Sequence, residues 1–141
     1  MFKAFKYRLY PTAPQAEKIN QNIGCARFVY NQLLDDRIKV YHETKQRSKK
    51  TYSILKEEHR FLKNADSRAL KHSQANLDEA YEKFKKEPNI GYPKFKAKHK
   101  CRWSYTTDNN NAPFVSMATG LDCQRLVSSK LLNIDCTKGA F

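Results

Sequence analysis

Apolar residues spaced three and four apart along residues 12–45 are the feature that most constrains the fold of this chain. They are Ile19, Ile23, Ala26, Tyr30, Leu33, Leu34, Ile38 and Tyr41. This spacing places apolar side chains on one face of an α-helix. Thr12 precedes the pattern as an N-cap, and Gln15 completes the sequence of a capping box. Because Gly24 interrupts the pattern, one long helix and two helices joined near Gly24 are both possible.

Two further helical stretches follow a basic linker at residues 46–50. The first covers residues 51–63, where Tyr52, Leu55 and Leu62 share a face. The second is predicted at residues 67–86, with Asp66 as its N-cap and Pro88 just after its end. Residues 12–90 are therefore expected to be mainly helical.

Two other stretches alternate with a period of two, which is typical of β-strands. In residues 5–10, Lys6 and Arg8 share one face. In residues 92–107, five cations alternate with a mostly apolar set, and these cations are Lys94, Lys96, Lys98, Lys100 and Arg102. A strand here would bury Phe95, Cys101 and Trp103 and turn the cations outward. The order strand, helices, strand predicts an α+β fold.

The charge of the chain favours an anionic partner. The formal net charge is +13 and the sequence pI is about 9.7, and such a charge attracts polyanions. Alternate residues on one strand face lie roughly 6.6 Å apart, so the cations would form a ladder on the scale of successive nucleotides. Trp103 and Tyr105 could stack on bases. For any single lysine a solvated surface is the better interpretation, but the ladder as a whole favours nucleic acid.

The sequence offers no pattern for catalysis, metal or membrane. Its four cysteines form no Cys-x-x-Cys pair, so a zinc site is not expected. The acidic cluster around Asp78 is better explained by helix caps and surface ion pairs. No apolar run approaches the ~20 residues of a membrane helix, so a cytoplasmic protein is expected. We expect no cofactor and no small-molecule substrate.

Four segments in order resemble a known family: "AFKYRLYPTAPQAEKIN", "GCARFVYNQLL", "SRALKHSQANLDEAYEKFKK" and "GYPKFKAK". They look like the N-terminal third of TnpB-type proteins, which are transposon-encoded RNA-guided DNA endonucleases, in the part described as a transposase helix-turn-helix region. The resemblance covers about residues 1–111.

The resemblance implies a partial β-barrel, the wedge, interrupted by an inserted α-helical bundle, the recognition lobe. Residues 1–11 would be the first wedge strand, residues 12–90 the recognition lobe, and residues 91–111 the basic return to the wedge. The partners implied are guide RNA and target-adjacent DNA, with RNA pairing reading most of the target. The family reads its short DNA motif at positions that fall on Tyr52, Ser67, Lys71 and the Thr106–Asn111 stretch, and Lys71 stands where some relatives have Gln.

The basic patterns and the family resemblance together predict a set of nucleic-acid-binding residues. They are Lys3, Lys6, Arg8, Arg27, Tyr52, Ser67, Lys71, Lys94, Lys96, Lys98, Lys100, Arg102, Thr107 and Asn109. Arg27 lies in a family signature, and two roles remain open for it. It contacts RNA, or it forms an ion pair with Asp35 or Asp36 or binds a sheet carbonyl.

Residues 112–141 depart from the family pattern and are nearly neutral, with "LVSSKLLNIDC" compatible with a helix or a strand. A frameshifted or truncated gene would give such a tail. The family's RuvC-like nuclease domain, with its three Mg²⁺-binding acidic residues, is not found in the sequence. We therefore expect a non-catalytic, nucleic-acid-binding N-terminal fragment. The alternative is an autonomous DNA-binding regulator of the helix-turn-helix type.

Overall fold

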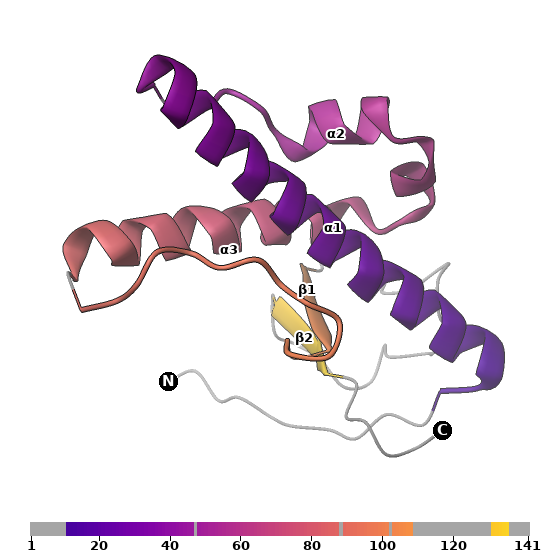
Figure 1. The fold of residues 1–141 in the computed structure, drawn as a ribbon. Coiled ribbons are helices and arrows are strands. Elements are labelled where there is room, and N and C mark those ends of the chain that lie inside the picture. The colour runs from indigo at the N-terminus through magenta and orange to yellow at the C-terminus, as the bar shows by residue number, and fades with distance from the viewer. Residues whose placement is uncertain (1–10, 47, 88, 102, 109–130, 136–141) are drawn as a thin grey trace.

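The computed structural model describes residues 11–46, 48–87, 89–101, 103–108 and 131–135. The element order is α1 (Ala13–Thr44), α2 (Tyr52–Glu58), the short 3₁₀ helix η1 (Arg60–Asn64), α3 (Ser67–Lys86), β1 (Ser104–Asp108) and β2 (Leu131–Asp135) (Figure 1). The helices carry most of the described residues, and a single pair of strands lies beside them.

Helix α1 is one continuous helix of 32 residues, so the first of the two alternatives at Gly24 is confirmed. Its start is capped as expected, because the backbone N–H of Thr12 donates to Oε1 of Gln15 at 2.8 Å. Its end is at Lys45, which adopts a left-handed conformation with φ of 56°. The N–H of Lys45 donates to the carbonyl of Tyr41 at 3.0 Å, a common way to end a helix.

Helix α3 has the predicted bounds, residues 67–86. The carboxylate of Asp66 accepts a hydrogen bond from the N–H of Arg68 at 3.0 Å, which satisfies one of the donors that every helix start leaves free. The predicted helix over residues 51–63 is divided into α2 and η1 at His59.

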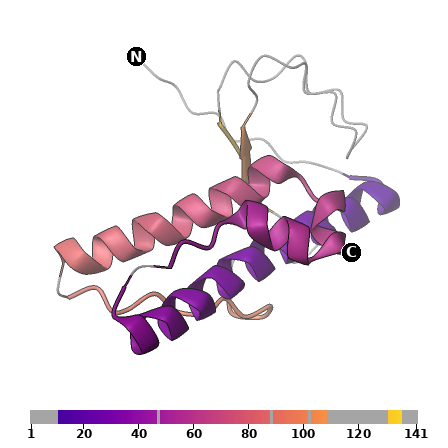
Figure 2. The same ribbon diagram turned by 90° about the horizontal axis from the view of Figure 1, so that it is seen from above.

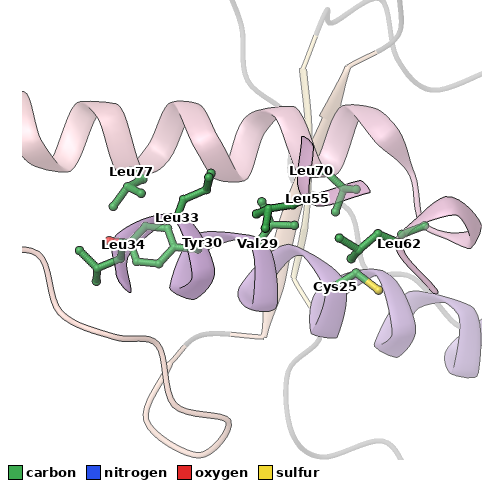
Figure 3. Close-up of a cluster of buried hydrophobic side chains, with 10 residues drawn as sticks. Cys25, Val29, Tyr30, Leu33, Leu34, Leu55, Leu62, Leu70 and Leu77 are labelled. Carbon is green, nitrogen blue, oxygen red and sulfur yellow. The ribbon is translucent and has the colours of Figure 1, made fainter. Parts of the chain in front are cut away.

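The main core lies between α1 and α3, which run side by side in the same general direction (Figures 1 and 2). Leu55 of α2 and Leu62 of η1 close it from a third side (Figure 3). The buried residues of this core are Cys25, Val29, Tyr30, Leu33, Leu34, Leu55, Leu62, Ala65, Leu70 and Leu77. A helix of this kind gains most of its stability by burying such a stripe rather than from its intrinsic helix propensity.

A second, smaller core joins the first half of α1 to the start of α3 and to β1. It contains Ile19, Ile23, Ala26, Ala69 and Tyr105, and Trp103 packs against it. This core holds the strand pair against the helices.

Strands β1 and β2 pair antiparallel, with Ser104 opposite Asp135 and Asp108 opposite Leu131. Residues 131–135 thus form a strand, which was one of two possibilities left open for this part of the sequence. The divergent tail therefore supplies the strand that pairs with the family-like part of the chain.

The predicted fold class, α+β with a partial β-barrel interrupted by helices, is wrong. The described residues are mainly helical, and their only sheet is the two-stranded ladder of β1 and β2. Residues 92–107 were expected to be a strand. Residues 104–107 do lie in β1, whereas residues 92–101 have no strand assignment. A strand needs a neighbouring strand to pair with its N–H and C=O groups. Here the side chain of Asn31 pairs with both of these groups of Lys96 instead. The predicted strand at residues 1–11 lies, except for Pro11, outside the described residues.

Among the residues described, no helix is both long enough and apolar enough to span a membrane.

Candidate nucleic-acid interface

Residues 91–101 and 103, which we call the basic loop, lie between α3 and β1 in the chain and pass along α1 (Figure 1). Its middle is fixed to α1 by Asn31. The Nδ2 atom of Asn31 donates to the carbonyl of Lys96 at 3.0 Å, and the N–H of Lys96 donates to Oδ1 of Asn31 at 2.8 Å. One amide side chain therefore satisfies both backbone groups of Lys96.

The Lys96 side chain points toward α1 rather than away from it. Its ammonium lies 4.1 Å from the centre of the Tyr30 ring, within the range of a cation–π interaction. Burial lowers the pKa of Lys96 below its ordinary value, and a smaller interaction with Cys101 acts the other way. Phe95, which was expected to be buried, is 55% exposed. The predicted division of this stretch into an apolar inner face and a cationic outer face is therefore wrong at Phe95 and Lys96.

A tight turn at Ala97 divides the predicted cation ladder. The N–H groups of Lys100 and Cys101 donate to the carbonyl of Ala97 at 3.3 and 3.1 Å. The indole Nε1 of Trp103 donates to the carbonyl of Lys98 at 2.8 Å. Lys94, Lys98 and Lys100 remain exposed. Among the described loop residues, three cations are thus exposed on a folded segment instead of along a straight strand.

The start of the basic loop rests on α3 through aromatic rings. The hydroxyls of Tyr81 and Tyr92 lie 2.5 Å apart. Tyr92 also makes edge-on contacts with the rings of Tyr81 and Phe84, with centroids 5.5 and 5.3 Å away. Burial and the hydrogen bond to Tyr92 raise the pKa of Tyr81 far above its ordinary value. These contacts and those of Asn31 give the loop two fixed points.

Arg27 is half-buried on α1, and within the described residues its guanidinium forms no ion pair. The two proposed acidic partners are engaged elsewhere. Asp35 binds Lys39 at 2.6 Å, and Asp36 accepts a hydrogen bond from Ser48. The ion-pair alternative for Arg27 is not realised in the described part of the chain, and its contact with RNA stays a prediction.

Tyr52, Ser67 and Lys71 belong to one surface, which we call the α2–α3 seam and which also includes Lys56 and Gln74. The ammonium of Lys56 donates to Oγ of Ser67 at 2.5 Å. The N–H of Tyr52 donates to Oε1 of Gln74 at 2.9 Å. Because Lys71 lies four residues after Ser67 and three before Gln74, all three share one face of α3. The structure therefore brings together three residues that the sequence separates by up to 19 positions.

Thr107 faces inward and is 3% exposed. Its hydroxyl donates to Oδ2 of Asp66 at 2.6 Å, and the N–H of Asp66 donates to the buried Oδ1 of Asn22 at 3.2 Å. This polar cluster links β1, α3 and α1. The predicted role of Thr107 in binding nucleic acid is not tested by these contacts, but its hydroxyl is already used within the chain.

The remaining predicted residues, Lys3, Lys6, Arg8, Arg102 and Asn109, lie outside the described residues.

Four residues that organise these surfaces were not among the predicted site residues: Asn31, Lys56, Asp66 and Gln74. Asp66 was predicted as a helix cap, but its contact with Thr107 was not. Asn31 lies in the segment that resembles the family signature, and this was the one signal that could have pointed to it. Lys56 and Gln74 give no sequence signal, because their contacts depend on how α2 packs against α3.

Within the described ranges, no group of three or more His, Cys, Asp or Glu side chains lies close enough together to hold a metal ion.

One family model and two known proteins are similar to the chain. A family model described as a helix-turn-helix domain, of the IS605 OrfB type, matches residues 1–46. A "Putative RNA-guided DNA endonuclease" of Streptomyces pristinaespiralis is 32% identical over 109 residues, which are 72% of this chain and 27% of the relative. The virulence protein VsdF of Salmonella dublin is 32% identical over 114 residues, which are 70% of this chain and 96% of the relative.

The chain belongs to the TnpB-type family. The predicted resemblance is thereby confirmed. The chain spans about a quarter of the length of the endonuclease relative, 27%, and nearly all of VsdF. The helix-turn-helix match and the endonuclease relative support a transposon-type protein that binds nucleic acid. Residues 11–46 of the matched region contain the single helix α1, to which the basic loop is attached.

Proposed function

We propose that this chain binds the guide RNA of a TnpB-type system and the DNA beside its target. The observation that carries the proposal is the fixed basic loop. Asn31 and Tyr81 hold it on two helices, while Lys94, Lys98 and Lys100 stay exposed. Cations held in place lose less conformational entropy on binding than cations on a free chain.

The two surfaces are suited to different tasks. The basic loop offers charge without a regular array of base-reading groups, which suits the phosphate backbone of a folded RNA. The α2–α3 seam offers a hydroxyl, an amide and two ammonium groups on packed helices, and such groups can read base edges. We assign the guide RNA to the loop and the target-adjacent DNA to the seam through Tyr52, Ser67 and Lys71.

The test compares binding of structured RNA and of duplex DNA over a range of salt concentrations. Changing Lys94, Lys98 and Lys100 together to Gln should reduce the magnitude of the slope of log K against log salt for RNA by about 2–3, at ~0.7 per lost phosphate contact on single strands and ~0.9 on duplexes. Lys63, Lys83 and Lys85 are also exposed, so their triple Gln variant has the same net charge and is the matched control. The control should keep most of the wild-type slope.

Two results would contradict the proposal. Equal losses in the two triple variants would mean that net charge alone attracts the nucleic acid. Tighter binding of duplex DNA than of structured RNA would favour the alternative, an autonomous DNA-binding regulator of the helix-turn-helix type.

A further inference from the structure

A cavity of about 210 Å³ lies between α1 and the turn of the basic loop. Its lining residues are Asn20, Ile23, Gly24, Arg27, Lys98 and Trp103. Four of them come from successive turns of α1, and the other two come from the basic loop. Because Asn31 fixes the loop to α1, both walls of the cavity are held in place before any ligand enters.

The lining combines positive charge, which attracts an anion, with apolar and aromatic side chains, which suit a planar ring. Arg27 and Lys98 are cationic, and no lining residue is acidic. Ile23 gives an apolar wall and is buried in the small core. The indole of Trp103 is held by its bond to Lys98, while the Lys98 ammonium lies 5.7 Å from the ring centre. A planar, apolar group with an attached anion matches this combination.

Gly24 supports the same interpretation independently. It lies inside a continuous helix, where glycine is unfavourable compared with alanine. Its backbone does not require glycine, because Gly24 lies within the continuous helix α1 and its φ is not positive. A Cβ atom at this position would meet no atom within 4 Å. The described part of the chain therefore gives no steric reason for a glycine here, whereas close approach of a ligand to the helix backbone would give one.

We propose that this cavity binds one unstacked nucleotide of single-stranded RNA, with its base against Trp103 and its phosphate between Arg27 and Lys98. Pockets for drug-sized molecules measure roughly 300–1,000 Å³, so a cavity of about 210 Å³ is better suited to a single base. Unstacked bases on aromatic side chains are the usual target of RNA recognition outside helices. The inference rests on the proposed RNA binding and adds to it a site for one specific nucleotide.

Trp103 is the only tryptophan in the sequence, so its fluorescence reports on this cavity alone. The experiment titrates the full chain with a labelled single-stranded RNA octamer and records tryptophan fluorescence together with anisotropy of the label. Stacking of a base on Trp103 should quench the tryptophan. An octamer with abasic riboses tests the phosphates alone, and a DNA octamer of the same sequence tests the sugar.

The decisive variant is Gly24→Leu, because a Cβ atom has space at this cavity-lining position and the longer leucine side chain should extend into the cavity. It should raise the melting temperature, remove the quenching and weaken RNA binding about tenfold, the size of one lost base–aromatic stack. The matched control is Gln21→Leu, an exposed position of α1 that does not line the cavity. It should leave quenching and affinity unchanged.

Four results would overturn the inference. RNA binding without quenching, unaffected by Gly24→Leu, would leave the proposed function intact and exclude the nucleotide site. Equal quenching by the abasic octamer would exclude the base, and tighter binding of the DNA octamer would exclude RNA as the ligand. An absence of octamer binding in the anisotropy signal would overturn the nucleotide site, whereas the proposed function is tested separately with structured RNA.

Discussion

The side-chain amide of Asn31 pairs with both backbone polar groups of Lys96, at 2.8 and 3.0 Å, across 65 positions of sequence. This single contact takes the place of a neighbouring strand and sets the path of the basic loop. It also brings the Lys96 ammonium over the ring of Tyr30. The position of Lys96 in the basic loop therefore depends on one residue of α1.

Changing Asn31 to Ala should lower the free energy of unfolding by about 1–3 kcal/mol, since it leaves two half-buried backbone groups without their partner. Amide exchange at Lys96 should become faster. Urea unfolding and hydrogen exchange measure the two effects. Asn76→Ala, at an exposed position of α3, is the control, and an equal loss there would show that the Asn31 contact contributes nothing.

The main core depends on Leu70, which is fully buried between α1 and α3 (Figure 3). Leu70→Ala should cost about 2–5 kcal/mol of stability, because it removes buried apolar area and leaves a cavity. Ile54→Ala, at an exposed position of α2, should cost far less. Thermal or urea unfolding of both variants checks the difference, and similar losses would disagree with the packing described.

The contact between Thr107 and Asp66 can be measured with a double-mutant cycle. Thr107→Val removes the hydroxyl that donates to Asp66, at a cost on the order of 1 kcal/mol. Asp66→Ala should cost more, because Asp66 also caps α3 and a lost N-cap costs about 0.5–2 kcal/mol by itself. The double variant should be less destabilised than the sum of the two, and strict additivity would mean that the two side chains do not interact.

The stability of the fold should decrease at alkaline pH because of Tyr105. Burial is the main cause that raises the pKa of Tyr105 from its ordinary value of 10.0, and the hydrogen bond with Asn22 opposes it in part. The folded state therefore keeps the phenol proton more tightly than the unfolded state. The contribution of Tyr105 to stability is fully present below the pKa that Tyr105 has in the unfolded state. It is lost as the pH rises through the higher pKa that Tyr105 has in the folded state.

Tyr105→Phe should cost about 1 kcal/mol near neutral pH, through the lost hydrogen bond. Its stability should then decline less than that of the wild type above pH 10, because Phe has no proton to lose. Tyr30 also has a raised pKa, so Tyr30→Phe gives a comparison within the main core. Urea unfolding at several pH values provides the measurement, and parallel pH profiles for wild type and Tyr105→Phe would contradict the assignment.

The sequence by itself determined the helices of this protein. The spacing of Ile19, Ile23 and their successors predicted α1, and Asp66 and Pro88 predicted the two ends of α3. These features are local, because a helix forms its backbone hydrogen bonds within four residues and its caps within three. The preference for an anionic partner also followed from the sequence, since the net charge of +13 does not depend on the fold.

The tertiary structure alone decided the conformation of the basic loop and the composition of the site. An alternating pattern predicts a strand only if another segment supplies hydrogen-bond partners, and for Lys96 the partner is Asn31 on a distant helix. That contact turned Lys96 inward and left Phe95 exposed, contrary to the alternation. The pairing of Ser67 with Lys56 and the cavity between Gly24 and Trp103 likewise depend on how separate elements pack, and no local pattern contains that information.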